Sequence, residues 1–308
     1  MPKFLITTAT GRQGTSTTRL LLAKGAEVNA LVRNPTSAAS LALQSMGATL
    51  FKGDSNDIPA VTAAMQGVNG IFLSTIPNFT DPASETHQAE NVLAAAHAAG
   101  TVTSVVVSTA WYTNLHEDWS VVEADFPVLS QFYASKSGVE RIVRAAGFTY
   151  TIIRPGSLMR NWIAPVPAYH FPEYMSSHQI TVSYPRDFRM DQLDAADVGQ
   201  VAAAVLLEPP HFAGAELTLL GPEALTFDEI VAHLSEAIGE KVTVKYRTAE
   251  ETAEARKTVS TVDMQVWSPT VPRVEDAKLA EYGFHWTTFK EFLEREKTAI
   301  RKTVGVEV

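Results

Sequence analysis

The feature that most constrains the fold is a regular alternation of short apolar runs with segments of helical periodicity. The apolar runs are rich in β-branched residues and bounded by turn residues, as strands covered on both faces are. They lie at 4–6, 28–32, 71–74, 105–107 and 150–153. The helical segments between them often end at a glycine, and they lie at 17–24, 41–46, 58–65, 85–99 and 135–146. This rhythm predicts an α/β protein with a doubly wound parallel sheet.

The rhythm changes after Arg154-Pro155-Gly156, where proline, methionine and aromatic residues become frequent. Later helices are announced by capping boxes, in which a threonine precedes a glutamate by three residues. These pairs are Thr226 with Glu229, Thr248 with Glu251, and Thr288 with Glu291. We therefore expect a nucleotide-binding domain over 1–155 and a smaller α+β portion over 156–308, with possible exchange of chain between them. A ligand is expected in the cleft that the two portions form.

The composition narrows the class of protein. The chain has 308 residues, is 45% hydrophobic, and carries 25 basic against 34 acidic residues, a formal charge of −9. This acidic balance argues against binding nucleic acid by charge. Cysteine is absent, which excludes disulfides and thiolate chemistry and suits a reducing compartment. We expect no targeting leader and no membrane anchor, since no run reaches the ~18 apolar residues of a membrane span. The cytoplasm is the expected location.

The first apolar run leads into the loop T-T-A-T-G-R-Q-G, which is typical of phosphate binding. Thr8, Gly11 and Gly14 occupy the three positions of a G-x-x-G-x-x-G pattern. Glycine at the last two positions allows close approach of the pyrophosphate and close packing of the following helix, whose first amides attract phosphate. Thr8 departs from the pattern. If the backbone there has a positive φ, threonine costs about 1–3 kcal/mol; otherwise its hydroxyl is free to cap the helix or bind the ligand.

The end of the second run distinguishes the two nicotinamide cofactors. An acidic residue there usually binds the ribose hydroxyls of NAD, whereas an arginine accommodates the 2′-phosphate of NADP. Arg33 occupies this place, and Arg12 in the glycine loop can reach the same phosphate. The sequence therefore favours NADP(H), although either arginine alone is equally consistent with a solvated surface residue. Asp54 is placed to read the adenine amino group or to serve only as a turn aspartate.

Several motifs in order resemble the NmrA-like proteins of the atypical short-chain dehydrogenase/reductase superfamily. They are TTATGRQG, LVRNP, GDSND, STIPN, VVVSTA, YASKSGVERIVRAAGFTYTIIRPG and LDAADVGQVAAAVLLEP, and together they extend from residue 3 to about residue 295. The resemblance implies a Rossmann domain with a small C-terminal domain and NADP(H) between them. Carried onto this chain, it implies a cofactor-binding set of Thr8, Thr10, Gly11, Arg12, Gln13, Gly14, Arg33, Asp54, Ser55, Thr75, Ile76, Thr109, Lys136 and Pro155.

The catalytic residues depart from the superfamily pattern. Its members use Tyr-x-x-x-Lys, with both side chains on one helical face so that the ammonium assists the phenol in acid–base chemistry. Here Phe132 lies four residues before Lys136, and Tyr133 lies three before it. These two positions differ by ~100° around a helix, so Tyr133 cannot simply replace the phenol and is expected to be structural. Lys136 resembles the residue that bonds the nicotinamide ribose and, in related reductases, serves as general acid or base. Tyr112 and Tyr133 remain candidate acids.

Two further features bear on the substrate. Thr109 ends the fifth apolar run, where its hydroxyl could polarise a carbonyl, and Trp111 and Tyr112 could form a wall for an aromatic compound. The segment 157–178 contains Met159, Trp162, Tyr169, Phe171, Tyr174 and Met175. These side chains either form a lid that excludes water or fill the core of the smaller portion. The eight histidines form no pair with metal-ligand spacing, and no metal site is expected.

These observations favour an NADPH-dependent reductase of the NmrA-like type, acting on a small aromatic or polyketide-like carbonyl or enone compound. The resemblance also includes non-catalytic redox sensors, so the alternative is an NADP(H)-binding module that regulates a protein partner. A third reading is a cofactor-free isomerase, dehydratase or scaffold, in which Thr8 closes the loop.

Overall fold

The computed structural model describes residues 1–78, 80–272 and 283–307. The chain forms two compact units. The first comprises Met1–Pro155 and Ala195–Leu219, and most of the remaining described residues form the second. The segment Ala195–Leu219 follows the first stretch of the second unit in sequence, yet it supplies a helix and a strand to the first unit.

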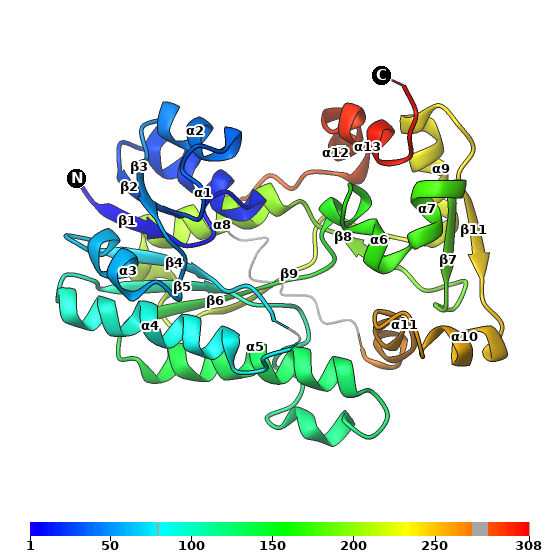
Figure 1. The fold of residues 1–308 in the computed structure, drawn as a ribbon, viewed down its shortest axis with the longest axis horizontal. Helices are drawn as coiled ribbons and strands as arrows, with labels where there is room; N and C mark the ends of the chain where they lie inside the picture. Colours follow the sequence, from blue (N-terminus) through cyan, green and yellow to red (C-terminus); the bar gives the residue numbers. More distant parts are fainter. Residues whose placement is uncertain (79, 273–282, 308) are drawn as a thin grey trace. The chain divides into compact units, whose positions relative to one another are not determined.

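The first unit contains a seven-stranded parallel sheet in the order β3-β2-β1-β4-β5-β6-β9 (Figure 1). Its apolar strands have neighbours on both faces, as predicted from their continuous β-branched runs. The strands are β1 (Lys3–Ile6), β2 (Glu27–Val32), β3 (Thr49–Lys52), β4 (Gly70–Ser74), β5 (Ser104–Ser108), β6 (Thr149–Pro155) and β9 (Glu216–Leu219). The prediction of an α/β fold with a doubly wound parallel sheet is confirmed.

Helices cover both faces of this sheet. One face carries a continuous apolar core built from the strands and three of the helices, namely α3 (Ile58–Ala64), α4 (Ser84–Ala99) and α5 (Pro127–Ala145). On the other face, α1 (Arg12–Ala23) packs along α8 (Ala195–Leu207). Their approach depends on Gly199, where an added Cβ would lie 2.8 Å from the backbone oxygen of Gln13. The remaining elements of this unit are α2 (Ala38–Ser45) and the 3-10 helices η1 (Trp119–Val122) and η3 (Pro209–Phe212).

The order of the strands reverses between β1 and β4, and this is where open α/β sheets bind ligands. Thr7, directly after β1, fixes the two strands together at this point. Its buried hydroxyl lies 2.8 Å from the Ser74 amide, which donates to it, and 3.0 Å from the Ser74 carbonyl oxygen. The loops that follow β1 and β4 therefore start from a rigid edge.

The second unit has its own apolar core. Met159, Trp162, Phe171 and Tyr174 lie within it, whereas Tyr169 is 69% exposed. For these four side chains the reading of segment 157–178 as core filling is the one that the structure supports. The elements are η2 (Met159–Trp162), α6 (Pro167–His170), α7 (Pro172–Ser177), β7 (Gln179–Val182), β8 (Met190–Gln192), β10 (Glu223–Leu225), α9 (Phe227–Ile238), β11 (Thr243–Tyr246), α10 (Ala249–Ala255), α11 (Val262–Trp267), η4 (Ser268–Thr270), α12 (Phe289–Arg295) and α13 (Lys297–Thr303).

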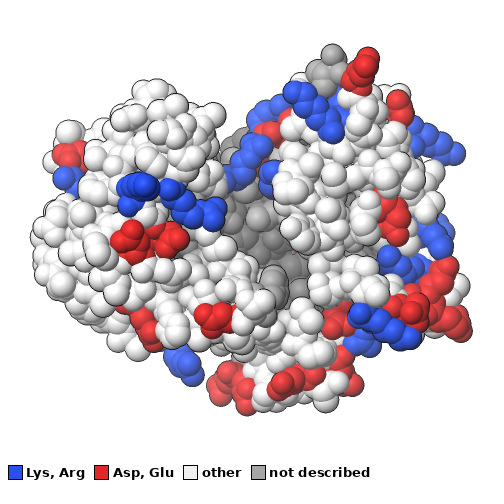
Figure 2. Space-filling model, in the orientation of Figure 1, with Lys and Arg blue, Asp and Glu red and all other residues white. Residues whose placement is uncertain are grey.

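All three predicted capping boxes form, at the starts of α9, α10 and α12. In each box the threonine hydroxyl accepts from the glutamate amide and the glutamate carboxylate accepts from the threonine amide, so two amides at the helix start are satisfied locally. Among the described residues, none of the helices is long and apolar enough to cross a bilayer. On the face shown in Figure 2, basic side chains lie in small groups beside acidic ones.

Candidate functional site

The loop after β1 is tightly folded around Thr8. The φ angle of Thr8 is +46°, in the left-handed region that favours glycine. Its carbonyl oxygen accepts a hydrogen bond from the Gly11 amide at 2.8 Å. The same oxygen lies 2.8 Å from where a Cβ at Gly14 would stand. The sequence pattern thus identified a position that does need glycine's conformational freedom, and threonine occupies it under strain.

This strain gives a testable expectation. Thr8→Gly should raise the free energy of unfolding by about 1 kcal/mol, because glycine adopts a positive φ without the clash that a β-branched side chain meets. Urea denaturation of both proteins measures the difference. Thr8→Ala is the control, since it removes the hydroxyl and keeps a Cβ. A stabilisation by alanine equal to that by glycine would show that the side chain beyond Cβ, and not the backbone angle, is responsible.

Helix α1 begins earlier than the sequence indicated, at Arg12, so Arg12, Gln13 and Gly14 form its first turn rather than a loop. Gly11 precedes the helix in an extended conformation, and no side chain caps the helix. The start of α1 therefore presents backbone amides and a partial positive charge to whatever lies before it.

Two details of this turn fit a dinucleotide. A Cβ at Gly14 would meet the backbone of Thr8 and Ala9 at 2.8–3.1 Å, so only glycine allows the helix so close to the strand. The side-chain oxygen of Gln13 is buried without a hydrogen-bond partner among the described residues, and buried polar atoms of this kind are rare unless a ligand or water completes them. The residues present are compatible with a pyrophosphate group at this helix start.

The remaining predicted cofactor residues lie at the carboxyl ends of the neighbouring strands. Thr10 is exposed in the glycine loop, and Arg33 is exposed directly after β2. Asp54 follows β3, and its carboxylate accepts from the Asn56 amide at 2.9 Å, which is the turn role considered for it. Ser55 is buried beside it. These positions all lie where the parallel strands β1, β2 and β3 end, as the parallel order of the strands requires.

The loop after β4 is held by the start of α4. Gln88 binds both backbone groups of Ile76, accepting from its amide and donating to its carbonyl, each at 3.0 Å. The hydroxyl of Thr75 donates to Glu85 Oε1 at 2.6 Å. The backbone at Thr75 and Ile76 is thereby fixed, while the Ile76 side chain is 44% exposed.

Lys136 is buried and paired. Its Nζ lies 2.5 Å from Glu85 Oε1, and the two side chains are 7% and 1% exposed. Ser135 donates to the other carboxylate oxygen, Glu85 Oε2, at 3.0 Å. Glu85 thus gathers Thr75 from the end of β4 and Lys136 from α5 into one polar cluster at the candidate site. Sequence reasoning did not identify Glu85; an acidic residue in the first turn of a helix reads as a favourable dipole partner and nothing more.

The tyrosines occupy different surroundings. Tyr133 is buried and stacks on Trp119, with ring centroids 4.5 Å apart, which matches the structural role expected of it. Phe132 lies beside the lysine, and Nζ is 5.5 Å from its ring centroid. Tyr112 is buried with a φ of +71° and stacks on Trp111 at 3.9 Å. The bulky residue at a positive φ marks the loop after β5 as a second strained point at this edge.

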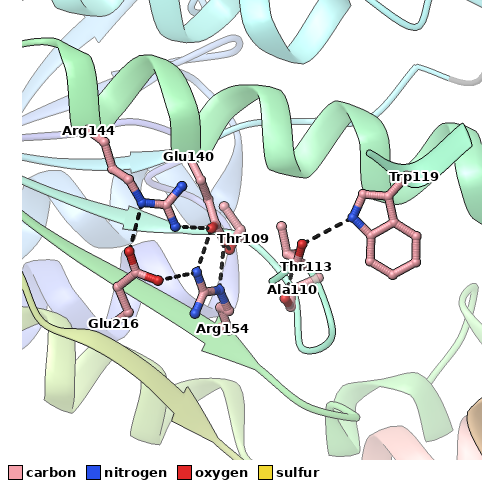
Figure 3. Close-up of polar contacts among 8 residues, drawn as sticks. All are labelled: Thr109, Ala110, Thr113, Trp119, Glu140, Arg144, Arg154 and Glu216. Carbon is pink, nitrogen blue, oxygen red and sulfur yellow. Dashed lines mark hydrogen bonds and ion pairs between the residues drawn. The ribbon is translucent and has the colours of Figure 1, made fainter. Parts of the chain in front are cut away.

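The hydroxyl of Thr109 is engaged by a buried ion-pair network (Figure 3). It donates to Glu140 Oε1 at 2.7 Å, so it cannot at the same time donate to a substrate carbonyl. Arg154 on β6 donates to both oxygens of Glu140, at 2.9 and 2.6 Å, and to Glu216 at 2.5 Å. Arg144 donates to the same two glutamates. The network joins α5, β6 and β9 to the end of β5.

The loop after β5 is also fixed through its backbone. The Trp111 amide donates to the carbonyl of Pro155, the last residue of β6, at 2.8 Å. Thr113 accepts from the Trp119 indole at 3.1 Å and donates its own hydroxyl to Ala110 (Figure 3). Among the described residues no group of histidine and acidic side chains is arranged to hold a metal ion.

A comparison with known protein families agrees with the fold and with the residues at the carboxyl ends of the strands. The model of the NmrA-like family matches residues 2–293. The chain belongs to the NmrA-like family. Quinone oxidoreductase 2 of Escherichia coli (strain K12) is 30% identical over 261 residues, which cover 84% of this chain and 82% of the relative. The resemblance stated from the sequence motifs is confirmed.

Solved structures of NmrA-like proteins share the fold. NmrA, a negative transcriptional regulator, in complex with NADP superposes with a TM-score of 0.77 at 20% identity, covering 99% of this chain and 98% of NmrA. An NADPH-dependent quinone oxidoreductase from Escherichia coli, complexed with NADPH, gives 0.73 at 24% identity and covers 95% and 99%. The curated relatives of this NmrA-like chain include further reductases, which supports the predicted enzyme class, an NAD(P)H-dependent oxidoreductase.

Proposed function

We propose that the protein is an NADPH-dependent reductase of small planar carbonyl compounds, with quinones and enones as the first class to test. The observation that carries the proposal is the polar cluster of Lys136, Glu85 and Thr75 at the same sheet edge as the glycine loop. A buried, paired lysine on α5, joined through Glu85 to Thr75 after β4, is suited to proton chemistry beside a bound nicotinamide. The named oxidoreductases among the relatives support the class.

The residues divide into binding and chemical roles. Gly11, Gly14 and the first amides of α1 would hold the pyrophosphate, and Arg12 and Arg33 the 2′-phosphate. NADPH supplies a hydride to the acceptor when it is bound. Lys136 would bond the ribose of the nicotinamide and deliver the proton that the reduced acceptor needs. The protein contributes orientation and a partly dry, preorganised polar environment.

The acceptor is expected to be flat and aromatic. Trp111 follows β5 and is half-buried, with one ring face covered by the Tyr112 ring at 3.9 Å. The Trp111 amide donates to the Pro155 carbonyl before this pair, and the Trp119 indole donates to the Thr113 carbonyl after it, so the loop is held on both sides. A rigid aromatic surface binds flat π systems at small entropic cost. This favours quinones over flexible aliphatic carbonyls.

Arg33→Ala tests the cofactor assignment. We expect the Kd for NADPH and NADP+ to rise about 10- to 100-fold, since a charge-assisted hydrogen bond to phosphate is lost, while the Kd for NADH and NAD+ changes little. A side-by-side titration with the four dinucleotides, followed by nicotinamide fluorescence or heat, measures this. Arg19→Ala is the control, because Arg19 is exposed on α1 and one turn or more from the loop. An equal loss for all four dinucleotides would contradict a 2′-phosphate role.

A redox sensor is the second candidate function. It is favoured by Phe132 at the position of the usual phenol. A sensor binds NADP(H) and consumes none, whereas a reductase oxidises NADPH once a quinone is added. The cofactor-free alternative predicts that none of the four dinucleotides binds. The titration and one turnover assay with a quinone therefore separate the three functions.

A further inference from the structure

The two oxygens of the Glu85 carboxylate face different partners. Oε1 accepts from Lys136 Nζ at 2.5 Å and from the Thr75 hydroxyl at 2.6 Å. Oε2 accepts from the Ser135 hydroxyl at 3.0 Å. A carboxylate can accept a proton at the oxygen on one side and, after rotation about its Cγ–Cδ bond, release that proton on the other side. Glu85 therefore connects Lys136 with Ser135, in addition to balancing the charge of the lysine.

Glu85 and its hydrogen-bond partner Ser135 both border a hollow. Glu85 and Ser135 line this partly open hollow together with Pro77, Asn78, Pro82, Gln131 and Phe132. Asn78, Gln131 and Ser135 provide polar groups that water can bind. Glu85 is itself 1% exposed. Ser135 is half-buried and stands at the border between the carboxylate and the hollow.

We propose that Glu85 transfers protons from water in this hollow to Lys136 during turnover. The inference rests on the proposed function. Reduction of a quinone to a hydroquinone takes up one hydride, which NADPH supplies, and one proton. An N–H bond of the Lys136 ammonium breaks as that proton leaves for the quinone oxygen. Glu85 Oε2 takes a proton from water in the hollow, and solvent neutralises the hydroxide that is left. Rotation of the carboxyl group about its Cγ–Cδ bond then brings this proton to the Lys136 amine, which recovers it.

In this proposal Glu85 takes the place of the phenol that the superfamily pattern has at position 132. Phe132 offers no hydroxyl at the position where a phenol would pass protons beside the lysine, and Nζ lies 5.5 Å from the Phe132 ring centroid. With the lysine 7% exposed, direct contact with bulk water is slight. Of the two residues that line the hollow and lie beside Nζ, Phe132 and Glu85, only Glu85 can carry a proton.

The test compares Glu85→Gln, Glu85→Ala and the control Glu90→Gln, which changes an exposed residue of the same helix. For Glu85→Gln we expect kcat with NADPH and a quinone to fall at least ~10-fold, with the Kd for NADPH within about 3-fold of wild type. In Glu85→Ala, added formate should enter the vacated space and restore part of kcat, whereas Glu85→Gln should not respond. Wild-type kcat in Glu85→Gln overturns the proposal. A fall in kcat matched by weaker NADPH binding, without rescue by formate, also overturns it.

Loss of Glu85 leaves a buried ammonium without its partner, which is strongly destabilising and can unfold both variants. Ser135→Ala then decides, because the ion pair is retained. We expect kcat to fall about 3-fold or more with an unchanged Kd for NADPH, and an unchanged kcat overturns the relay. If wild type binds NADPH but oxidises none with any quinone, the proposed function fails first. If wild type is active and these variants match it, only the role of Glu85 fails.

Discussion

Replacement of Lys136 by glutamine is expected to lower kcat for NADPH-dependent quinone reduction by a factor of about 10²–10⁴, the usual contribution of a positioned acid–base group. Glutamine retains an N–H donor one bond shorter than the ammonium that now lies 2.5 Å from Glu85 Oε1, but it cannot deliver a proton to the substrate. Steady-state rates at saturating NADPH, with the melting temperature measured in parallel, give the result.

Two tyrosine variants are the matched controls for Lys136→Gln. Tyr133→Phe should leave kcat within about 3-fold of wild type, because Tyr133 is buried against Trp119 and serves packing. Tyr112→Phe tests the remaining phenol near the end of β5. A full rate in Lys136→Gln together with a large loss in Tyr112→Phe would move the acid–base role from the lysine to that tyrosine.

The sheet could be predicted because each strand is specified by its own residues. The five apolar runs found in the sequence are β1, β2, β4, β5 and β6 of the structure, each extended by at most one or two residues at its ends. The helices were predicted less well at their starts. Helix α1 begins at Arg12 and α5 at Pro127, well before their apolar periodicity becomes visible. The polar first turn of α1 carries no periodic signal, so a pattern of apolar residues places its start too late, whereas Pro127 at the start of α5 is itself a signal for the first turn of a helix.

The candidate site could be predicted where the sequence pattern points to one backbone position. The glycine pattern singled out Thr8 and left open whether its φ is positive, and the structure has +46° there. The partners of charged residues were not predictable. Glu85 lies 51 residues from Lys136 in sequence, and Glu140 lies 31 residues from Thr109. An acidic residue on a helix shows no sign in sequence of which distant cation it will meet, because only the tertiary fold brings them together.

The same limit applies to Thr109. Its hydroxyl was considered for polarising a substrate carbonyl, since it ends a strand that leads to the expected ligand. The structure commits that hydrogen to Glu140 instead. Glu140 is itself 2% exposed and bound by two arginines, so a third donor helps to satisfy its lone pairs. The network thus connects helix α5, which carries Lys136 one turn earlier, to the ends of β5 and β6.

Arg154→Met is expected to lower the free energy of unfolding by about 3–5 kcal/mol, the cost of leaving a buried charge without its partner. Arg154 and Glu140 are each 2% exposed, and the guanidinium binds both carboxylate oxygens in a fork at 2.9 and 2.6 Å. Arg144 still reaches Glu140 at 2.9 Å, which limits the loss. Urea denaturation at neutral pH measures the change, with Arg141→Met, an exposed arginine on α5, as the control.

The double variant Arg154→Met with Glu140→Leu separates charge from packing. It should regain at least about 1 kcal/mol over Arg154→Met, because an apolar pair of similar volume leaves no buried charge uncompensated. No recovery would show that the shape of the guanidinium, not its charge, holds β6 to α5.

The dependence of the free energy of unfolding on acidic pH tests the role of Glu216 in the ion-pair network. Burial acts to raise the pKa of Glu216, but hydrogen bonds and charge from Arg144 and Arg154 outweigh it and lower that pKa below the ordinary value of 4.5. A carboxylate with a lowered folded pKa adds stability above its unfolded pKa, and this stability is lost as the pH falls through the folded value. Wild type should therefore lose stability more steeply below pH 4.5 than Glu216→Gln does. Parallel slopes in urea titrations across that range would show that the arginines do not act on Glu216 in this way.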